Sequence, residues 1–469
     1  MANFWDYNVW GTLNVVAVLL LSLLVANAVK RSVRWLQASL IPTSVLGGGI
    51  LLFISVIYKA ITGTALFNTA FFGGSGIATM EVITYHTLAL GFIAATFKSG
   101  GGKMSKKRTV EIFNTGVTTV ATYLLQAVLG MGICFIALLF VKDFFVAAGV
   151  LLPFGYGQGT GQAMNYGNIY ETQFGFAGGK SFGLTIAALG FLSAAIGGVI
   201  HLNILRRKGL IRVQNRKEGA VSLEEVQADN EIPMQGSIDK LTVQVAFVIA
   251  AYMLTYLMMW VLGNILPGMR AVIYGFNFLL GVLSATLIKT AVNGLHKKNI
   301  IHRQYLNDFL MTRCSNFFYD IMVVAGIAAI QLEALKDNWG ILLILGSVGL
   351  VSTYAYERFV AKKLFAEYEQ EQFLAMYGML TGTASTGIIL LREIDGEFRT
   401  PAADNMVYQN FPAIVFGFPM MLLATLAPVK PVLTFIILVL FFLAMNILLF
   451  RSFIFKKKKS AEAPEQGAG

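Results

Sequence analysis

The sequence predicts an all-α polytopic membrane protein with two inverted-topology repeats and one extra C-terminal transmembrane helix. Each repeat is expected to hold five transmembrane helices and a reentrant hairpin. Three observations lead to this prediction: long apolar runs, two stretches in which glycine interrupts such runs, and a one-sided distribution of lysine and arginine. Of the 469 residues, 56% are hydrophobic and only 13% are charged. A soluble domain carries about twice that charged fraction, so the composition excludes an ordinary soluble protein.

Apolar runs long enough to cross a bilayer, about 17–25 residues each, recur along the whole chain. In a first repeat, 1–205, we expect spans at 10–28, 39–58, 82–97, 112–141 and 182–205. A hydrophilic stretch, 206–240, is expected to be a cytoplasmic linker. In a second repeat, 241–427, we expect spans at 241–266, 271–288, 314–330, 340–360 and 407–426. The last segment, 428–469, contains an eleventh span at 432–450 and a basic cytoplasmic tail.

Two stretches are unsuited to an unbroken membrane helix. The first, 149–164, contains Pro153 followed by glycine at every second position from 155 to 161. Alternating glycines weaken a helix, and proline removes a backbone donor. Because lipid does not accept unpaired amides, broken backbone at membrane depth must be buried in protein or line a wet cavity. With a second stretch at 379–387, this pattern predicts reentrant hairpins near 146–170 and 370–392 that meet near the middle of the membrane.

The distribution of basic residues predicts the orientation. With the N-terminus outside, 30 lysines and arginines fall in inside segments and six in outside segments. Cytoplasmic loops of membrane proteins carry such an excess, so the C-terminus is expected to be cytoplasmic. The first repeat then starts outside and the second starts inside, which makes the repeat inverted. The net charge of +11 is thereby explained by topology, and we expect no nucleic-acid partner.

Several motifs resemble those of one transporter family. They are Ile41-Pro42-x-x-Val45-x-Gly47-Gly48, Gln126 with Gly130, Gly157-x-Gly159-Thr160-Gly161-x-Ala163, Gly197-Gly198, and more loosely Gly382-Thr383-Ala384-Ser385-Thr386-Gly387. With them the chain resembles the bacterial sodium:glutamate symporters, the ESS family. The resemblance implies a homodimer in the inner membrane whose core moves against a fixed scaffold, an elevator-type mechanism. The chain departs from the family at Gln158, where a histidine is usual, and at Met164 and Asn165, near a usual tryptophan.

The tip of the first hairpin has the chemistry of a carboxylate site. Its glycines allow backbone amides to approach a ligand closely, and its side chains add one hydroxyl and two amides. The N-termini of broken helices carry partial positive charge, which suits an anionic group. We therefore expect the substrate to bind at Gln158, Gly159, Thr160, Gly161, Gln162, Thr383, Ser385 and Thr386. The alternative is that these small residues serve only close helix packing.

The second tip and one intramembrane acid are the expected ion site. Thr381 and Thr383 offer hydroxyl and carbonyl oxygens, which coordinate sodium in unwound segments. Asp320 lies inside a predicted span, where carboxylates are costly and are functional candidates by default. Asn316 lies one turn earlier on the same face. We expect these four residues to bind sodium; the alternatives are hydroxyls that bond to the preceding turn and a structural role for Asp320.

No nucleotide-binding loop, zinc motif or serine-nucleophile motif occurs in the sequence. We therefore expect no enzyme, no cofactor and no metal other than transported Na⁺. The predicted function is a sodium-coupled secondary active transporter that imports glutamate or a similar small anionic amino acid through the bilayer. Bound sodium would compensate the charge of the buried substrate. The open alternatives are a sodium- or proton-coupled carrier of another carboxylate, such as a dicarboxylate or hydroxycarboxylate, and a membrane channel.

Overall fold

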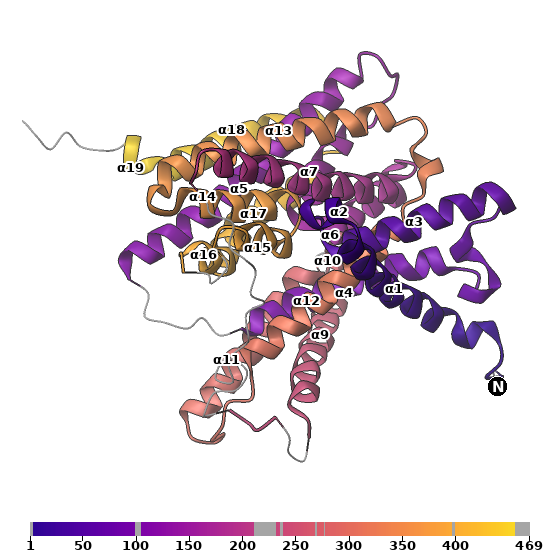
Figure 1. Ribbon diagram of the computed structural model, residues 1–469, viewed down its shortest axis with the longest axis horizontal. Helices are drawn as coiled ribbons and strands as arrows, with labels where there is room; N and C mark the ends of the chain where they lie inside the picture. The colour runs from indigo at the N-terminus through magenta and orange to yellow at the C-terminus, as the bar shows by residue number, and fades with distance from the viewer. Residues whose placement is uncertain are drawn as a thin grey trace, which may run out of the picture.

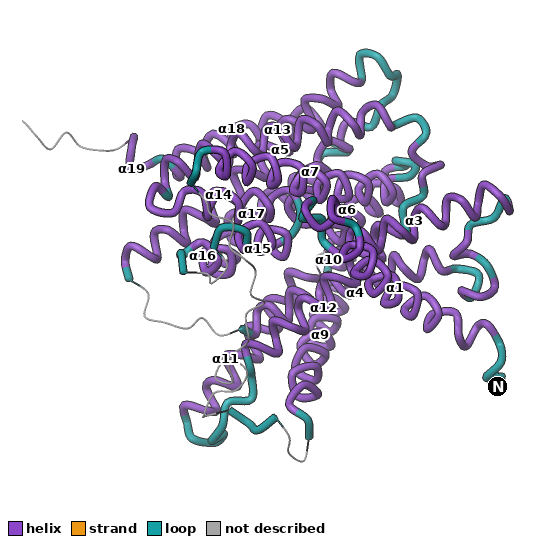
Figure 2. The backbone as a smooth tube through the Cα atoms, in the orientation of Figure 1, coloured by secondary structure: helices purple, strands orange, loops and turns teal. Residues whose placement is uncertain are grey.

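The computed structural model describes residues 3–98, 105–210, 231–234, 238–267, 270–275, 277–395 and 399–454. Within these ranges every long element is a helix, and the only β-type pairing is a single bridge between Glu231 and Gln304 (Figure 2). The all-α fold class is therefore confirmed for the part of the chain that the structure describes.

The first half of the chain forms six long helices and several short ones (Figure 1). They are α1 (Tyr7–Ser32), α2 (Arg34–Ala38), α3 (Thr43–Thr62), η1 (Leu66–Asn68), η2 (Ala70–Phe72), α4 (Gly76–Phe97), α5 (Lys106–Ala137), η3 (Val146–Val150), α6 (Leu151–Phe174) and α7 (Gly179–Arg207). The start of α5 is fixed by Ser105, whose side chain accepts a hydrogen bond from the Arg108 amide at 3.2 Å. Such caps satisfy one of the free amides at a helix start.

The second half forms a comparable series. It comprises α9 (Lys240–Ile265), α10 (Arg270–Gly275), α11 (Asn277–Lys297), α12 (Asp308–Ala328), η5 (Leu332–Leu335), α13 (Trp339–Leu364), η6 (Ala366–Tyr368), α14 (Glu369–Thr381), α15 (Ala384–Arg392), α16 (Ala402–Tyr408), α17 (Asn410–Leu426), α18 (Pro431–Leu449) and α19 (Arg451–Ile454). Asp239 caps α9 and Asn307 caps α12 through their side-chain oxygens. Pro431 occupies the first position of α18, where its missing N–H costs nothing.

Nine helices among the described residues are long and apolar enough to cross a membrane, and a tenth counts if 402–408 and 412–426, bent by 52°, form one span. The chain is thus a multi-pass membrane protein, but its described residues do not contain the eleven unbroken spans that the sequence predicts. The expected span at 314–330 corresponds to α12, in which Arg313, Asn316 and Asp320 interrupt the apolar sequence. The expected span at 407–426 is divided between α16 and α17.

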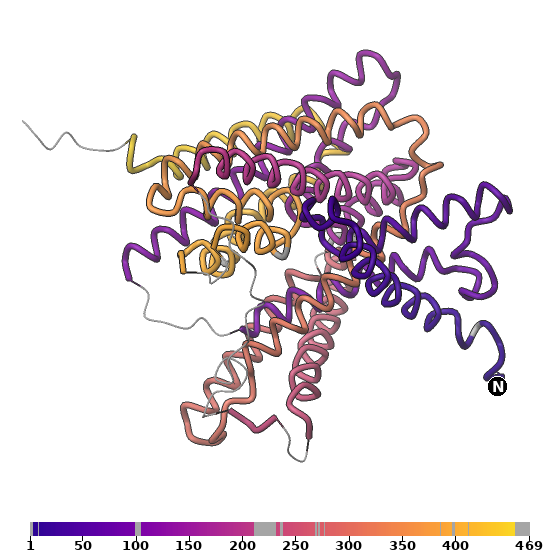
Figure 3. The backbone as a smooth tube through the Cα atoms, viewed as in Figure 1, coloured from indigo at the N-terminus to yellow at the C-terminus, as the bar shows by residue number. Residues whose placement is uncertain are grey.

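The helices form two groups that meet at α6 (Figure 1). In the arm group, α1 packs on α3 and α9 packs on α11. The first of these arms contacts α12 through α3, and the second contacts α4 through α11, so the packed pair α4 and α12 joins the two arms. In the bundle group, α5, α7, α13 and α16–α18 lie around the two broken helices, α6 and α14–α15. Both groups combine early and late parts of the chain (Figure 3). The two sequence halves are therefore interleaved in space.

Three buried tyrosines hold α6 in the bundle group. Tyr156, Tyr166 and Tyr170 are each at most 1% exposed. Their hydroxyls donate to backbone carbonyls, Tyr156 to α13 at 2.6 Å and the other two to α17 at 2.9 and 2.7 Å. A buried tyrosine combines a large apolar surface with one satisfied polar atom. These contacts anchor α6 to neighbours on both sides.

Candidate functional site

The helix α6 folds back on itself at Gly159. This residue has φ +74° and ψ −166°, a conformation that side-chain-bearing residues rarely adopt. The rings of Phe154 and Tyr166 stack with centroids 4.0 Å apart and planes 6° apart. In an uninterrupted helix twelve residues would separate them by about 18 Å. The segment is therefore a helical hairpin with arms on either side of Gly159.

The other glycines of this hairpin serve close packing. A Cβ atom on Gly157 would lie 2.0 Å from the Tyr123 ring, and one on Gly155 would lie 2.6 Å from Ile186. Real Cβ atoms do not approach other atoms this closely, so any larger residue would push the arm away from α5 or α7. The close-packing interpretation of the glycine pattern thus holds for these positions. The turn itself depends on Gly159.

The second break forms another hairpin. The arm α14 ends at Thr381, Gly382 and Thr383 leave the helical conformation, and α15 begins at Ala384. A Cβ atom on Gly378 would lie 2.7 Å from the Cα atom of Gly387, so the two arms are in backbone contact. This close contact between residues on either side of the turn identifies a tight antiparallel hairpin.

The two hairpin tips touch. A Cβ atom built on Gly159 would lie 3.1 Å from Cγ2 of Thr383 and 3.9 Å from the carbonyl oxygen of Gly382. The two segments that the sequence predicts to meet therefore do so, at the centre of the helix assembly where α6 also contacts α4, α12 and α14. Figure 1 shows α6 where the arm group joins the bundle group.

The polar side chains of the first tip differ in whether their hydrogen-bonding atoms have partners. Thr160 is fully buried and its hydroxyl donates to the Met322 carbonyl of α12 at 3.2 Å. Gln162 is also fully buried and accepts a hydrogen bond from Asn165 at 3.0 Å, but its Nε2 has no partner among the described residues. Oε1 of Gln158, buried as an atom, likewise has none. Buried polar atoms without partners are rare in folded proteins, and these atoms keep hydrogen-bonding capacity that a water or a ligand can use.

The second tip is held by its own hydroxyls. Thr381 is fully buried and donates to the Tyr377 carbonyl at 2.6 Å, which is a bond to the preceding helical turn. The hydroxyls of Thr383 and Thr386 lie 3.4 Å apart. Thr386 is 1% exposed and Thr383 is half-buried beside Gly159. The side chain of Ser385 lies outside what the structure describes. Of the predicted hydroxyls, Thr383 is thus the one in contact with the first tip.

The structure does not bring Asp320 and Asn316 to the second tip. Both side chains are exposed, and the Asp320 carboxylate lies near buried Ser44 of α3. No described hydrogen bond or ion pair joins either residue to Thr381 or Thr383. The reason is helical geometry. The α12 residue whose carbonyl meets Thr160 follows Asp320 by two positions, which rotates Asp320 by about 200° to another face.

One buried acid was missed by the sequence analysis. Glu357 of α13 is 1% exposed, and the hydroxyl of Thr122 on α5 donates to its Oε1 at 2.5 Å. One turn along, Nε2 of Gln126 donates to the hydroxyl of Thr353 at 2.8 Å and to the Leu380 carbonyl at 3.0 Å. Two rungs of hydrogen bonds thus connect α5 to α13, and the second also reaches the arm of the second hairpin.

A signal for Glu357 was present in the sequence. The small residues Gly346, Gly349 and Thr353 recur at spacings of three and four, which marks one face of a helix. Glu357 continues this spacing by one further turn. In the structure the same face is buried, since Cβ atoms at the two glycines would meet Leu189 and Tyr156. A stripe of small residues that ends in an acid therefore indicated a buried carboxylate.

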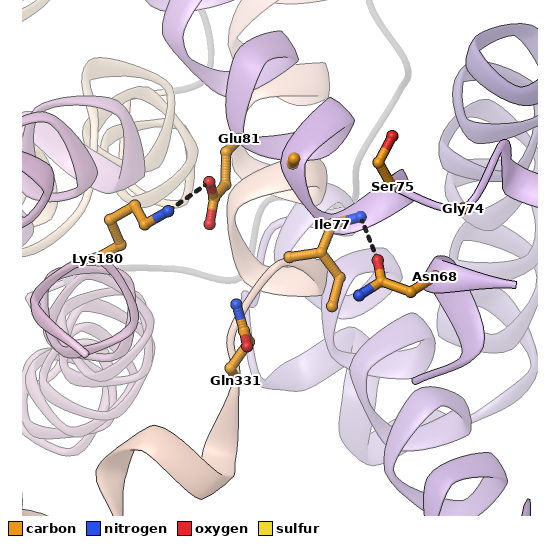
Figure 4. A pocket seen from close by; sticks show the side chains of 8 residues that line it. Asn68, Gly74, Ser75, Ile77, Glu81, Lys180 and Gln331 are labelled. Carbon is orange, nitrogen blue, oxygen red and sulfur yellow. Dashed lines mark hydrogen bonds and ion pairs between the residues drawn. The ribbon is translucent and has the colours of Figure 1, made fainter. Parts of the chain in front are cut away.

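A small depression lies between the two groups, at the starts of α4 and α7 (Figure 4). The cavity measures about 230 Å³, and its polar lining includes Asn68, Ser75 and Gln331. Glu81 of α4 and Lys180 of α7 form an ion pair at 2.7 Å beside it. Glu81 precedes Leu88, which contacts Gly161, by seven residues, or about 10 Å of helix. The cavity thus lies about two turns of α4 away from the first tip, where the arm group faces the bundle group.

Comparison of the whole chain with known protein families and with curated proteins finds no match. The chain is therefore interpreted from its own residues, with the two touching tips as the candidate functional site. The sequence resemblance described above remains an expectation.

Proposed function

We propose that this chain is a sodium-coupled secondary active transporter that imports glutamate or a similar small anionic amino acid. The observation that carries the proposal is the contact between two helix breaks, at Gly159 and Thr383, in the centre of a membrane protein. Broken helices in the two halves of a chain are typical of the substrate site of secondary transporters.

The electrostatics of the tips favour an anionic substrate. The second arm of α6 begins at Thr160 and α15 begins at Ala384, so two helix N-termini start at the point of contact. Helix N-termini carry about half a positive charge. Gln162 adds an N–H donor that has no partner among the described residues. A carboxylate at this point would accept hydrogen bonds that the protein alone leaves unmade.

The packing supports the proposed inverted repeat. The contact of α1 with α3 corresponds to that of α9 with α11, and the contact of α3 with α12 corresponds to that of α11 with α4. The first two contacts each lie within one half, whereas the last two each join a helix of one half to a helix of the other at the equivalent position in the helix order. We propose that 1–205 and 241–427 are the two repeats, joined by 206–240 and followed by 428–469. The N-terminus is proposed to lie outside and the C-terminus in the cytoplasm.

Two helix groups that meet near the tips suit an alternating-access mechanism. The bundle group contains both hairpins, whereas the arm group contributes α4 and α12 against the first tip. In an elevator-type cycle the bundle group would carry the substrate past the arm group. The proposed assembly is a homodimer in the lipid bilayer, as the sequence resemblance implies.

The decisive experiment is uptake of radiolabelled glutamate by proteoliposomes that contain the full chain. Uptake is expected to saturate, to require an inward sodium gradient and to be reduced by unlabelled glutamate. Competition by dicarboxylates or hydroxycarboxylates instead of glutamate would favour the other carboxylate carrier. Uptake that is driven by a pH gradient without sodium would show that the coupling ion is H⁺ instead of Na⁺. Ion currents without any substrate would favour a channel and contradict the proposal.

A further inference from the structure

Glu357 is a buried carboxylate that forms no ion pair with any basic residue that the structure describes. It is 1% exposed, and its hydrogen-bond donor is the neutral hydroxyl of Thr122. The adjacent Arg358 forms its ion pair with Glu369 instead. No described lysine, arginine or histidine forms an ion pair with Glu357. An isolated buried carboxylate is strongly disfavoured unless it binds a proton or a cation.

The Thr122 hydroxyl lies against this carboxylate, and a second side chain, whose oxygen has no described partner, lies one helical turn away. Thr122 and Gln126 are one helical turn apart on α5, about 6 Å along the helix axis, and both are fully buried. The amide of Gln126 is held through its Nε2 by Thr353 and Leu380, while its Oε1, buried as an atom, has no partner among the described residues. Oxygen atoms of carboxylates, hydroxyls and amides are the ligands of hard cations in proteins.

We infer that Glu357, together with Thr122 and Gln126, forms the binding site of the coupled sodium ion within the bundle group. The inference rests on the proposed function and moves its ion site from Asp320 to Glu357. The two acids differ in their surroundings. Asp320 is exposed on α12 of the arm group, whereas Glu357 is enclosed by the helices that hold the second hairpin.

The geometry connects this site to the substrate. Gln126 donates to the carbonyl of Leu380, the residue before Thr381 at the end of α14. The carbonyl of Thr381 is itself packed so closely against α7 that a Cβ atom on Gly190 would lie 2.6 Å from it. A cation bound to Oε1 of Gln126 would fix the orientation of the amide and thereby the end of α14. Coupling of this kind is reciprocal, so substrate would also strengthen sodium binding.

The test compares sodium binding by the purified full chain and by variants, without relying on transport. The measurement is the rise in melting temperature when potassium chloride is replaced by sodium chloride at constant ionic strength. The wild-type protein is expected to be stabilised by sodium. Glu357→Gln keeps the shape and removes the charge, so the half-saturating sodium concentration should rise by about tenfold or more. Glu367→Gln is the matched control, because that exposed acid pairs with Lys107 at the surface.

Two further measurements keep the outcome interpretable. Glu357→Gln should be at least as stable as the wild type without sodium, because an unpaired buried charge is removed. Thr122→Val, which removes only the hydroxyl, should weaken sodium stabilisation by a smaller factor. If wild-type uptake requires sodium but Glu357→Gln shows unchanged sodium stabilisation, the Glu357 inference is wrong and the proposed function stands. If wild-type uptake ignores sodium, the proposed coupling itself fails.

Discussion

Gly159 and Thr383 come from opposite halves of the chain, yet a single added methyl group on Gly159 would lie 3.1 Å from the methyl group of Thr383. The approach depends on two local features. The first hairpin turns at a positive φ angle, and the second leaves the helix at Gly382. Because both features are needed at the same point, small changes in either residue should have large effects on the site.

Gly159→Val is expected to abolish uptake while the protein still reaches the membrane. A β-branched residue at φ +74° is strained by about 1–3 kcal/mol, and its side chain would meet Thr383. Uptake and the amount of protein in the membrane are measured together. The matched control is Gly49→Val in α3, because a Cβ atom at Gly49 meets nothing within 4 Å. Near-normal uptake by Gly159→Val would remove the first tip as the substrate site.

Gln162→Leu is expected to raise the KM for glutamate by roughly tenfold to a hundredfold at saturating sodium. A hydrogen bond to a charged group contributes about 1.5–3 kcal/mol, and Nε2 of Gln162 is available for one. The maximal rate should change less than KM, provided that the bond is already made in the bound state. Gln37→Leu, at an exposed position of α2, is the control. An unchanged KM would show that Gln162 does not bind substrate and serves only to accept the hydrogen bond of Asn165.

Asp320→Asn is expected to leave the sodium dependence of uptake within about twofold of the wild type. Exposed substitutions away from a site usually change free energies by less than about 0.5 kcal/mol, and Asp320 contacts Ser44 instead of a tip. The half-saturating sodium concentration is the quantity to measure. A steep increase would return the ion site to α12, as the sequence first suggested.

The hairpin breaks could be predicted because their causes are local. The run of alternating glycines located the first break because glycine accepts the positive φ angle of the turn, which falls at Gly159, whereas Pro153 lies inside the first helical arm. The apolar runs likewise predicted most of the long helices, because hydropathy needs no knowledge of neighbours. Hydropathy failed at α12, where Arg313 and Asp320 interrupt the apolar character of a helix that packs closely on α4.

The facing of individual side chains could not be predicted in the same way. Asp320 and the residue that bonds to Thr160 are two positions apart on α12, and only the packing against α3 and α6 decides which of them meets the tip. Glu357 carries a carboxyl group but is as buried as an apolar core residue, because α5 and α14 cover it. The sequence of α13 does not say which helices will pack on it, so it gives no direct measure of how far Glu357 is buried. The spacing of small residues on α13 was the one indirect signal.

The proposed orientation predicts the labelling of two introduced cysteines. A cysteine at Ala228, which lies outside the described residues, should react only with reagents that reach the cytoplasmic side. A cysteine at Asn338, before α13, should react with impermeant reagents added outside. The native Cys134 and Cys314 are buried and free, and both are replaced first to remove background. Reaction of both positions from the same side would contradict the inverted repeat.

The ion pair between Glu81 and Lys180 leads to the last prediction. It joins α4 of the arm group to α7 of the bundle group at 2.7 Å, and both side chains are mostly buried, with 15% and 24% exposed. If the groups move past each other during transport, this contact must form and break once in every cycle. Reversing one charge should therefore disturb transport more than removing it, because like charges would be forced together whenever the groups meet.

Glu81→Lys is expected to lower the maximal uptake rate by more than about tenfold, since like charges in contact cost several kcal/mol. The double variant Glu81→Lys with Lys180→Glu restores the attraction in reverse and should recover uptake to within about fivefold of the wild type. Both rates are measured at equal amounts of protein in proteoliposomes. If the double variant is as impaired as Glu81→Lys, the pair does not act as a contact between the groups, and Glu81 is required for another reason. Recovery would instead assign the contact between α4 and α7 to the transport cycle, because reversal of both charges restores the attraction between these two positions.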